Sequence, residues 1–441
     1  MPPLRRHRDR ACSAATPYPN GGFLSRRHRR SRSRRARADD DDGGLPADVL
    51  SEIFVRASSG VADVARFSST CRSWGLIAAT HAAAICRALP PPTQYHTHLT
   101  LGFFHQENED VRAFHRRRRP RDSPQPSFVP TASASRLLGP LPLGSHLLGG
   151  LFDHARPVAS RNGRLVLELR RQERAQGLTL SVCNPMTGEV SVLPALSGED
   201  CPGYYACAIL TGHDLDAGTP LGFFRVLLVY NRPSFTALRI FSSDVGSWGP
   251  EGRKPGAKMD AGKLRRLGPA VVVGGVAYWP MHRAALGVRL DGAPTEAIMD
   301  VCFIPYVQHY FPQFRLMGVT PDGSLSFVFA LFTHGLSITV DSLKPSTPSK
   351  WEFREFIKLP EAPASPTIPP TAFKLRWFNE KSGTVLFTTT QGGEAVGGAF
   401  MVNLATRSVE KLAGGLDCHG WRNFCGYEMD RAGLLASLAR F

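Results

Sequence analysis

The sequence predicts a multidomain chain of the α + all-β class, in which a small three-helix module precedes a larger domain of strands. Two observations support this division. Apolar residues recur with helical spacing between residues 44 and 89, whereas from residue 156 onward about twenty short β-branched and aromatic runs alternate with turn residues. With 441 residues, 42% of them hydrophobic, the chain has the length of two or three globular domains.

The first helix is predicted to begin at Pro46, because the fixed φ and missing N–H of proline are tolerated in a first helical turn. Four apolar residues then follow at i, i+1, i+4 and i+5 and form one stripe, made of Val49, Leu50, Ile53 and Phe54. The segment Ser58-Ser59-Gly60 ends this helix.

A second short helix is predicted over residues 61–67. A third carries Cys71 and Trp74 and runs to residue 89, because Pro90 cannot continue it. Three short helices bury little apolar surface, so we expect the exposed stripe to contact a partner. The alternative is an ordinary helical hairpin that packs on its own chain.

These residues resemble an F-box, the three-helix module that docks onto the Skp adaptor of cullin-RING ubiquitin ligases. The resemblance is carried by Leu45-Pro46, Asp48, Leu50, Glu52-Ile53, Arg56, Cys71-Arg72 and Trp74. It implies an adaptor-binding surface made of Leu45, Pro46, Val49, Leu50, Ile53, Phe54, Val64 and Trp74. The sequence departs from the pattern at Ala57, Thr70 and Gly75. A glycine inside a helix costs about 0.5–1 kcal/mol, so we expect weaker docking than in a consensus member.

The second part of the chain reads as short strands separated by turns such as Asn162-Gly163, a strong hairpin signal. The predicted strands lie near residue 158 and at 165–169, 178–182, 190–193, 204–210, 223–230, 238–241, 270–273, 276–279, 286–290, 314–319, 325–329, 336–340, 351–357, 373–377, 384–389, 399–403, 408–412 and 424–427. A short helix is expected over residues 429–441. One sandwich seldom needs so many strands, whereas radial blades of four strands use them naturally. We therefore predict a β-propeller of five or six blades.

A second resemblance covers residues 156–441. It is carried by Cys183-Asn184-Pro185-Met186-Thr187-Gly188-Glu189, Leu193-Pro194, Phe224-Arg225-Val226, Phe241-Ser242-Ser243 and Trp248. These motifs are similar to the kelch-like F-box-associated β-propeller of plant F-box proteins, most of all in the subfamilies expanded in grasses. The resemblance implies a propeller that presents loops to a target protein, and it does not specify the target.

Two further segments are expected to lie outside the folded domains. Residues 1–43 are rich in Arg and Ser and poor in aliphatic residues, so we predict a disordered arm. A solvated extension is favoured over a nuclear-localisation or nucleic-acid-binding arm, since aromatic residues for base stacking do not alternate with the arginines. Residues 90–155, with the basic run 116–121, are predicted to be a linker or insertion. The net charge of +16 is therefore partly a property of the arm.

No catalytic or metal site is predicted. The nine cysteines are scattered without the spacing of zinc ligands, which indicates a reducing compartment. The isolated histidines and His213-Asp214 lack a nucleophile, and no glycine-rich phosphate loop is found. No apolar run is long enough to cross a membrane, and no secretory signal is expected.

A recognition surface is considered for the aromatic residues Tyr204, Tyr205, Tyr306, Tyr310 and Phe311, although packing within the sheets is favoured for each.

The sequence thus predicts a non-enzymatic substrate-recognition subunit of an SCF-type (Skp–cullin–F-box) ubiquitin ligase. Its expected partners are the Skp adaptor, cullin through that adaptor, and an unidentified target protein. No cofactor, membrane or nucleic-acid partner is expected, and the expected location is the nucleus or cytoplasm. The alternative is a stand-alone protein- or nucleic-acid-binding propeller with a degenerate F-box. A propeller-based hydrolase is a third, less favoured hypothesis.

Overall fold

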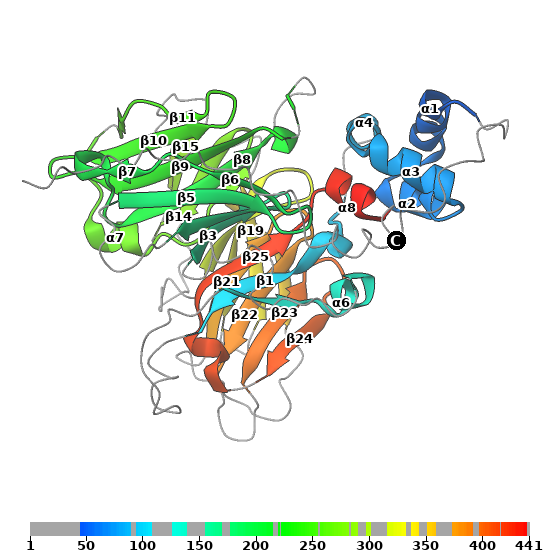
Figure 1. Cartoon of the computed structure of the whole chain (residues 1–441). Coiled ribbons are helices and arrows are strands. Elements are labelled where there is room, and N and C mark those ends of the chain that lie inside the picture. Colours follow the sequence, from blue (N-terminus) through cyan, green and yellow to red (C-terminus); the bar gives the residue numbers. More distant parts are fainter. Residues whose placement is uncertain are drawn as a thin grey trace, which may run out of the picture.

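The computed structural model describes residues 45–89, 94–107, 126–138, 155–169, 177–214, 219–220, 222–254, 256–281, 284–289, 297–300, 315–331, 337–343, 351–358, 373–390, 397–414 and 416–438. The predicted arm over residues 1–43 and the basic run 116–121 lie outside these residues. Within the described part, helices gather on one side and antiparallel sheets form the rest (Figure 1).

Four short helices make up the N-terminal helical module: α1 (Ala47–Ala57), α2 (Val61–Ser68), α3 (Arg72–Thr80) and α4 (Ala82–Ala88). The prediction of one third helix up to residue 89 is wrong, because α3 and α4 are separate. The hydroxyl of Thr80 donates to the carbonyl of Leu76 at 2.8 Å, a side-chain bond that tends to bend helices. His81 then leaves the helical region, with φ −100° and ψ 11°.

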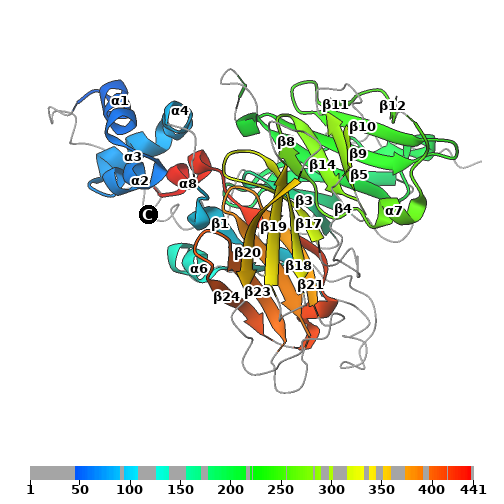
Figure 2. The same cartoon turned by 180° about the vertical axis from the view of Figure 1, so that it is seen from behind.

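The core of this module includes the last helix of the chain, α8 (Arg431–Leu438). Leu434 and Leu435 of α8 are buried together with Phe54, Val64 and Ile85. Figures 1 and 2 both show α8 between the N-terminal helices and the sheets. The module therefore obtains part of its apolar core from the opposite end of the chain, which compensates for its small size.

Five sheets are antiparallel meanders, each made of four consecutive strands in the order of the chain. The first two sheets contain β3 (Ala155–Arg161), β4 (Arg164–Leu169), β5 (Gly177–Asn184) and β6 (Glu189–Val192), and then β8 (Tyr205–Thr211), β9 (Phe224–Asn231), β10 (Thr236–Ser242) and β11 (Ser247–Trp248). Two-residue strands extend them, β7 (Leu196–Ser197) on β5 and β12 (Gly252–Arg253) on β10.

The next three sheets follow the same plan. They contain β13 (Val271–Val273), β14 (Val276–Pro280), β15 (Ala284–Arg289) and β16 (Ala297–Asp300); β17 (Arg315–Val319), β18 (Leu325–Leu331), β19 (Ser337–Leu343) and β20 (Trp351–Lys358); and β21 (Phe373–Asn379), β22 (Thr384–Thr389), β23 (Gly398–Asn403) and β24 (Val409–Gly414). Every strand predicted from the sequence between residues 156 and 428 overlaps one of these strands or β25 (Arg422–Glu428).

The sixth sheet joins the two ends of the chain. Its strands are β1 (Thr100–Gln106) and β2 (Ser127–Pro130), which come from the predicted linker, and β25. β1 lies in the middle, with Phe103 opposite Val129 of β2 and Gly426 of β25. The linker prediction for residues 90–155 is therefore wrong for these strands, because long-range pairing with β25 gives them a sheet to join.

The first strands of the five meanders and β25 contact one another in cyclic order, β3 to β8, β13, β17, β21, β25 and back to β3. This arrangement of sheets around an axis is that of a β-propeller. Gly426 permits the close approach of β25 to β21, since a Cβ there would lie 2.3 Å from Trp377. Shorter helices connect the strands: η1 (Thr97–Leu99), α6 (Ala132–Leu138), η2 (Gly198–Asp200), η3 (Gly212–Asp214), α7 (Ala261–Arg265) and η6 (Leu416–Gly420).

Candidate functional site

The inner strands β3, β8, β21 and β25 end on the same side of the propeller, where their following turns meet. We call this side the near end, because β25 leads there directly into α8, which packs against the helical module. The turn after β3 is Asn162-Gly163, with φ of 49° and 75°, as expected for the predicted two-residue hairpin. Gly163 N donates to the carbonyl of Glu428 at 2.8 Å, so this turn is tied to the end of β25.

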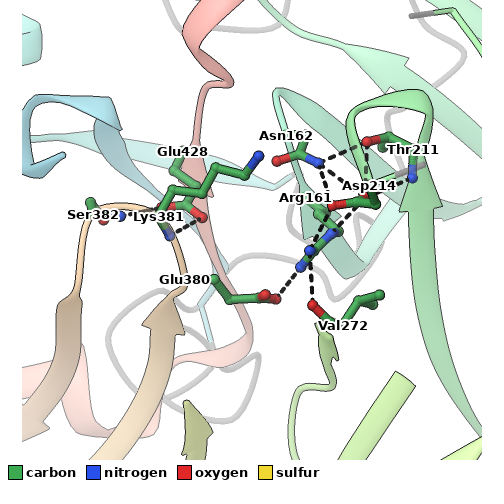
Figure 3. Close-up of polar contacts among 9 residues, drawn as sticks. All are labelled: Arg161, Asn162, Thr211, Asp214, Val272, Glu380, Lys381, Ser382 and Glu428. Atoms are coloured by element: carbon green, nitrogen blue, oxygen red, sulfur yellow. Dashed lines mark hydrogen bonds and ion pairs between the residues drawn. The ribbon is translucent and has the colours of Figure 1, made fainter. Parts of the chain in front are cut away.

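Arg161, the last residue of β3, is the centre of a buried polar cluster at the near end (Figure 3). Its Nε and Nη2 donate to the two carboxylate oxygens of Asp214 at 2.9 and 2.7 Å. Its Nη2 also donates to the carbonyl of Val272 at 3.0 Å, and its Nη1 pairs with Glu380. One guanidinium therefore joins the turns after β3, β8 and β21 to strand β13.

A second set of polar contacts lies beside this cluster, at the end of β25. The carboxylate of Glu428 accepts hydrogen bonds from the backbone N–H of Lys381 and of Ser382, at 3.1 and 3.2 Å. The hydroxyl of Ser382 also donates to Glu428 at 3.0 Å and lies 2.5 Å from the hydroxyl of Thr100 on β1. These bonds link the turn after β21 to both the first and the last strand of the sixth sheet.

Burial and charge move the pKa values of these groups in opposite directions. Asp214 is buried, which raises its pKa, but the Arg161 guanidinium outweighs burial and holds the pKa well below its ordinary value. Burial raises the pKa of Glu380 to about 7, and Arg161 offsets this only in part. Glu428 also has a raised pKa because it is buried. Asp214 is therefore the permanent counter-ion of Arg161, whereas Glu380 titrates near neutral pH.

The inner strands leave little space along the propeller axis. The cavity there has room for about one water molecule, and it is lined by residues of β3, β8 and β13 together with Trp377 and Glu380. The carboxylate among its lining residues is that of Glu380, and it pairs with Arg161. Among the described residues, no group of three His, Cys, Asp or Glu side chains could bind a metal ion.

The eight predicted adaptor-binding residues do not form one exposed surface. Leu45, Val49 and Ile53 are 53%, 40% and 38% exposed, and Pro46 is also exposed. Leu50, Phe54 and Val64 are buried, with at most 3% of their surface exposed. Trp74 is partly buried and contacts Phe54 edge to face, with ring centroids 5.6 Å apart.

The separation follows from helix geometry. Val49 and Ile53 lie one turn apart on one face of α1, whereas Leu50 and Phe54 lie on the adjacent face, which packs on the other helices. The predicted single stripe is therefore two stripes. The exposed apolar face of α1 consists of Val49 and Ile53, and exposed Leu45 lies two residues before the helix.

One exposed apolar residue of the module was not predicted. Leu76 on α3 is 64% exposed, although α3 also carries buried Ala78 and partly buried Trp74 and Ile77. The signal was present in the sequence, because Leu76 is two residues after Trp74 and therefore lies away from the face shared by Trp74 and Ile77.

Other sequence candidates have structural roles. His213 and Asp214 do not form a catalytic pair: His213 contacts Asp430 at 3.2 Å, and Asp214 binds Arg161. Of the aromatic residues considered for recognition, Tyr205 is partly buried and donates to Glu168, whereas Tyr204 is exposed. Tyr306, Tyr310 and Phe311 lie outside the described residues. The seven described cysteines are free thiols. No helix in the described part of the chain is long and apolar enough to span a membrane.

Residues 140–281 match a family described as a domain of unknown function (DUF7595). No curated protein matches the chain significantly. Among solved structures, a functionally unknown protein from Desulfotomaculum acetoxidans is similar at a TM-score of 0.34 and 12% identity, over 73% of this chain and 83% of that one. The GH93 α-L-arabinofuranosidase of Fusarium graminearum is similar at a TM-score of 0.32 and 11% identity, over 59% of this chain and 79% of that one. The WD40 domain of SCAP from fission yeast is similar at a TM-score of 0.26 and 8% identity, over 59% of this chain and 64% of that one. We infer nothing about this protein from similarities this low. The propeller architecture is established by the contacts between this chain's own sheets.

Proposed function

We propose that this protein is a non-catalytic substrate-recognition subunit of an SCF-type ubiquitin ligase. The observation that carries the proposal is the exposed apolar face of α1, made of Val49 and Ile53, with exposed Leu45 just before the helix. In this proposal the face docks on a Skp-type adaptor, and a propeller of six blades holds the target. The sixth blade is the three-stranded sheet β2-β1-β25, which closes the ring.

The exposed face supports docking because the module does not need it for folding. Its apolar core is completed by Leu434 and Leu435 of α8, and yet Leu45 before α1 and Val49 and Ile53 on it remain exposed. Burial of such side chains contributes about 1.5–3 kcal/mol each when it is complete. Apolar side chains that stay exposed close together are typical of an interaction site.

The attachment of the module to the propeller also suits this function. α8 follows β25 directly and is buried in the helical core, and Met429 N donates to the carbonyl of Leu99 at 2.9 Å. A ligase subunit acts by holding its target near the ubiquitin-charged enzyme, which raises the effective concentration of the target. A firm connection between the helical module and the propeller serves that purpose. The location proposed for the protein is the nucleus or cytoplasm.

The test is binding of the full chain to a purified Skp-type adaptor, with the double variant Val49→Gln and Ile53→Gln. We expect adaptor binding to be at least about tenfold weaker in this variant, since 1.4 kcal/mol corresponds to a factor of ten. The matched control is Val192→Gln with Val245→Gln, which removes two exposed valines from β6 and from the turn between β10 and β11.

Leu50 is unsuited to this test, because it is buried and its truncation would destabilise the module itself. Equal binding by the α1 variant and the wild-type chain would contradict docking through this face. Absence of binding by the wild-type chain would favour a stand-alone binding propeller.

A further inference from the structure

A cluster of basic residues covers the end of the propeller opposite the helical module. We call it the α7 surface; it consists of Arg253, Lys258, Lys263, Arg265, Arg266 and Tyr204. Each of these residues is exposed. Its position follows from strand direction, because β8 begins beside Tyr204 and ends at the near end with Thr211. Both overall views place α7 on the side of the sheets away from the helices (Figures 1 and 2).

The backbone beneath the α7 surface is well anchored. Met259 and Leu264 are buried in the core shared by the second and third sheets. The carbonyl of Met259 accepts from Asn231 Nδ2 at 2.8 Å, and its N–H donates to Thr236 Oγ1 at 2.7 Å. Asp260 caps α7, accepting from the N–H of Gly262 and of Lys263 at 2.8 and 3.1 Å. The exposed cations are therefore carried on a fixed segment.

Two of the cations are also held by aromatic rings. The guanidinium of Arg265 lies over the ring of Tyr204, 3.9 Å from its centroid, and that of Arg253 lies 5.3 Å from the centroid of Phe235. Lys258 Nζ donates to the carbonyl of Pro233 at 2.9 Å. Such contacts fix a side chain without neutralising its charge, so each cation stays available to an anion.

The charge of the surface is not balanced locally. The α7 surface has five cations, and the acidic residue within the same stretch, Asp260, uses its carboxylate as the helix cap. The nearby Glu251 is bonded to Arg232 and Tyr230. Among the ion pairs of the described residues, none joins a carboxylate to Lys258, Lys263, Arg265 or Arg266. A fixed group of unneutralised cations is complementary to an acidic partner.

We propose that the α7 surface binds an acidic polypeptide segment of the target protein. This inference rests on the proposed function only in naming the target as the source of the segment. A polypeptide is favoured over single-stranded nucleic acid, because base stacking needs open aromatic faces and an arginine lies over one face of each of Tyr204 and Phe235. Arginine side chains at fixed positions bind carboxylates in a bidentate manner.

The experiment measures binding of a fluorescent polyglutamate peptide to the full chain, without any adaptor. The test variant is Lys263→Gln, Arg265→Gln and Arg266→Gln, because glutamine keeps the helix propensity of α7. The matched control removes three exposed arginines elsewhere, by Arg56→Gln, Arg66→Gln and Arg136→Gln. We expect the peptide to bind at least about tenfold more weakly to the α7 variant, and the control to bind within about twofold of the wild-type chain.

A carbodiimide cross-link then maps the bound peptide. This reagent joins carboxylates to lysine amines, and residues 1–44 contain no lysine, so the arginine-rich arm cannot contribute a lysine cross-link. We expect coupling to Lys258 or Lys263.

Three outcomes would overturn the proposal: no binding of polyglutamate, equal weakening in the control variant, or stronger binding of an oligothymidylate of equal charge that the α7 variant also loses. The last outcome would identify a nucleic-acid surface. Since no adaptor is present, a failure here is separate from a failure of adaptor docking.

Discussion

At the near end of the propeller Arg161 is buried between two carboxylates, whereas at the far end Arg265 lies in solvent over the ring of Tyr204. The two residues have the same side chain and different roles. Arg161 joins turns from separate sheets, so its charge is used inside the fold. Arg265 is held by the ring of Tyr204, and none of the ion pairs among the described residues gives it a counter-ion. The comparison separates charges that stabilise this protein from charges that are available to a partner.

The largest effect is expected from Arg161→Ala, which leaves Asp214 and Glu380 buried without a cation. Removing one partner of a buried ion pair costs about 3–5 kcal/mol. We expect a matching fall in the midpoint of urea unfolding, which is measured by tryptophan fluorescence. The control is Arg265→Ala at the far end, which should change stability by no more than about 0.5 kcal/mol. If both variants unfold at the same midpoint, the two ends do not differ as described.

A smaller effect that depends on pH is expected from Glu380→Gln. The pKa of Glu380 is raised from its ordinary value of 4.5 to about 7. Between these pH values the folded protein binds a proton that the unfolded chain does not bind, so the contribution of Glu380 to stability falls as the pH rises through 7. Glutamine removes this titration, and the variant should therefore gain about 1–3 kcal/mol relative to wild type between pH 5 and 8.

Urea midpoints of wild type and Glu380→Gln at several pH values test this prediction. Other buried groups titrate in both proteins and cancel in the difference. The exposed Glu52, which pairs with Arg56 on α1, supplies the control Glu52→Gln. A constant difference between wild type and Glu380→Gln across this range would show that Glu380 is ionised throughout.

The smallest effect on stability is expected from the α7 variant, Lys263→Gln, Arg265→Gln and Arg266→Gln. Exposed substitutions of this kind change the free energy of unfolding by about 0.5 kcal/mol or less. Thermal unfolding of the variant and the wild-type chain measures the difference. A loss comparable to that of Arg161→Ala would mean that the far-end cations stabilise the fold, and their availability to a partner would then be in doubt.

Local patterns in the sequence were sufficient to predict many of the helices and strands. Asn162-Gly163 predicted a hairpin because few residue pairs adopt positive φ so readily, and the structure has φ of 49° and 75° there. Alternating β-branched and aromatic runs predicted strands throughout residues 156–428. The spacing of apolar residues indicated α1, but it could not show which of two neighbouring stripes would be buried, because that depends on where α3, α4 and α8 pack.

The sequence by itself determined that the chain has a short helical module and a large antiparallel β domain, since helix and strand periodicity are local properties of the chain. Only the tertiary structure decided how the ends meet. β1 carries no turn or repeat signal that names β25 as its partner, and the pairing joins residues about three hundred positions apart. The Arg161 cluster likewise combines residues from the end of β3 and from the turns after β8 and β21, whose proximity arises when the sheets close around the axis. The spacing of residues in the sequence does not predict such proximity, because the proximity arises from the packing of the sheets.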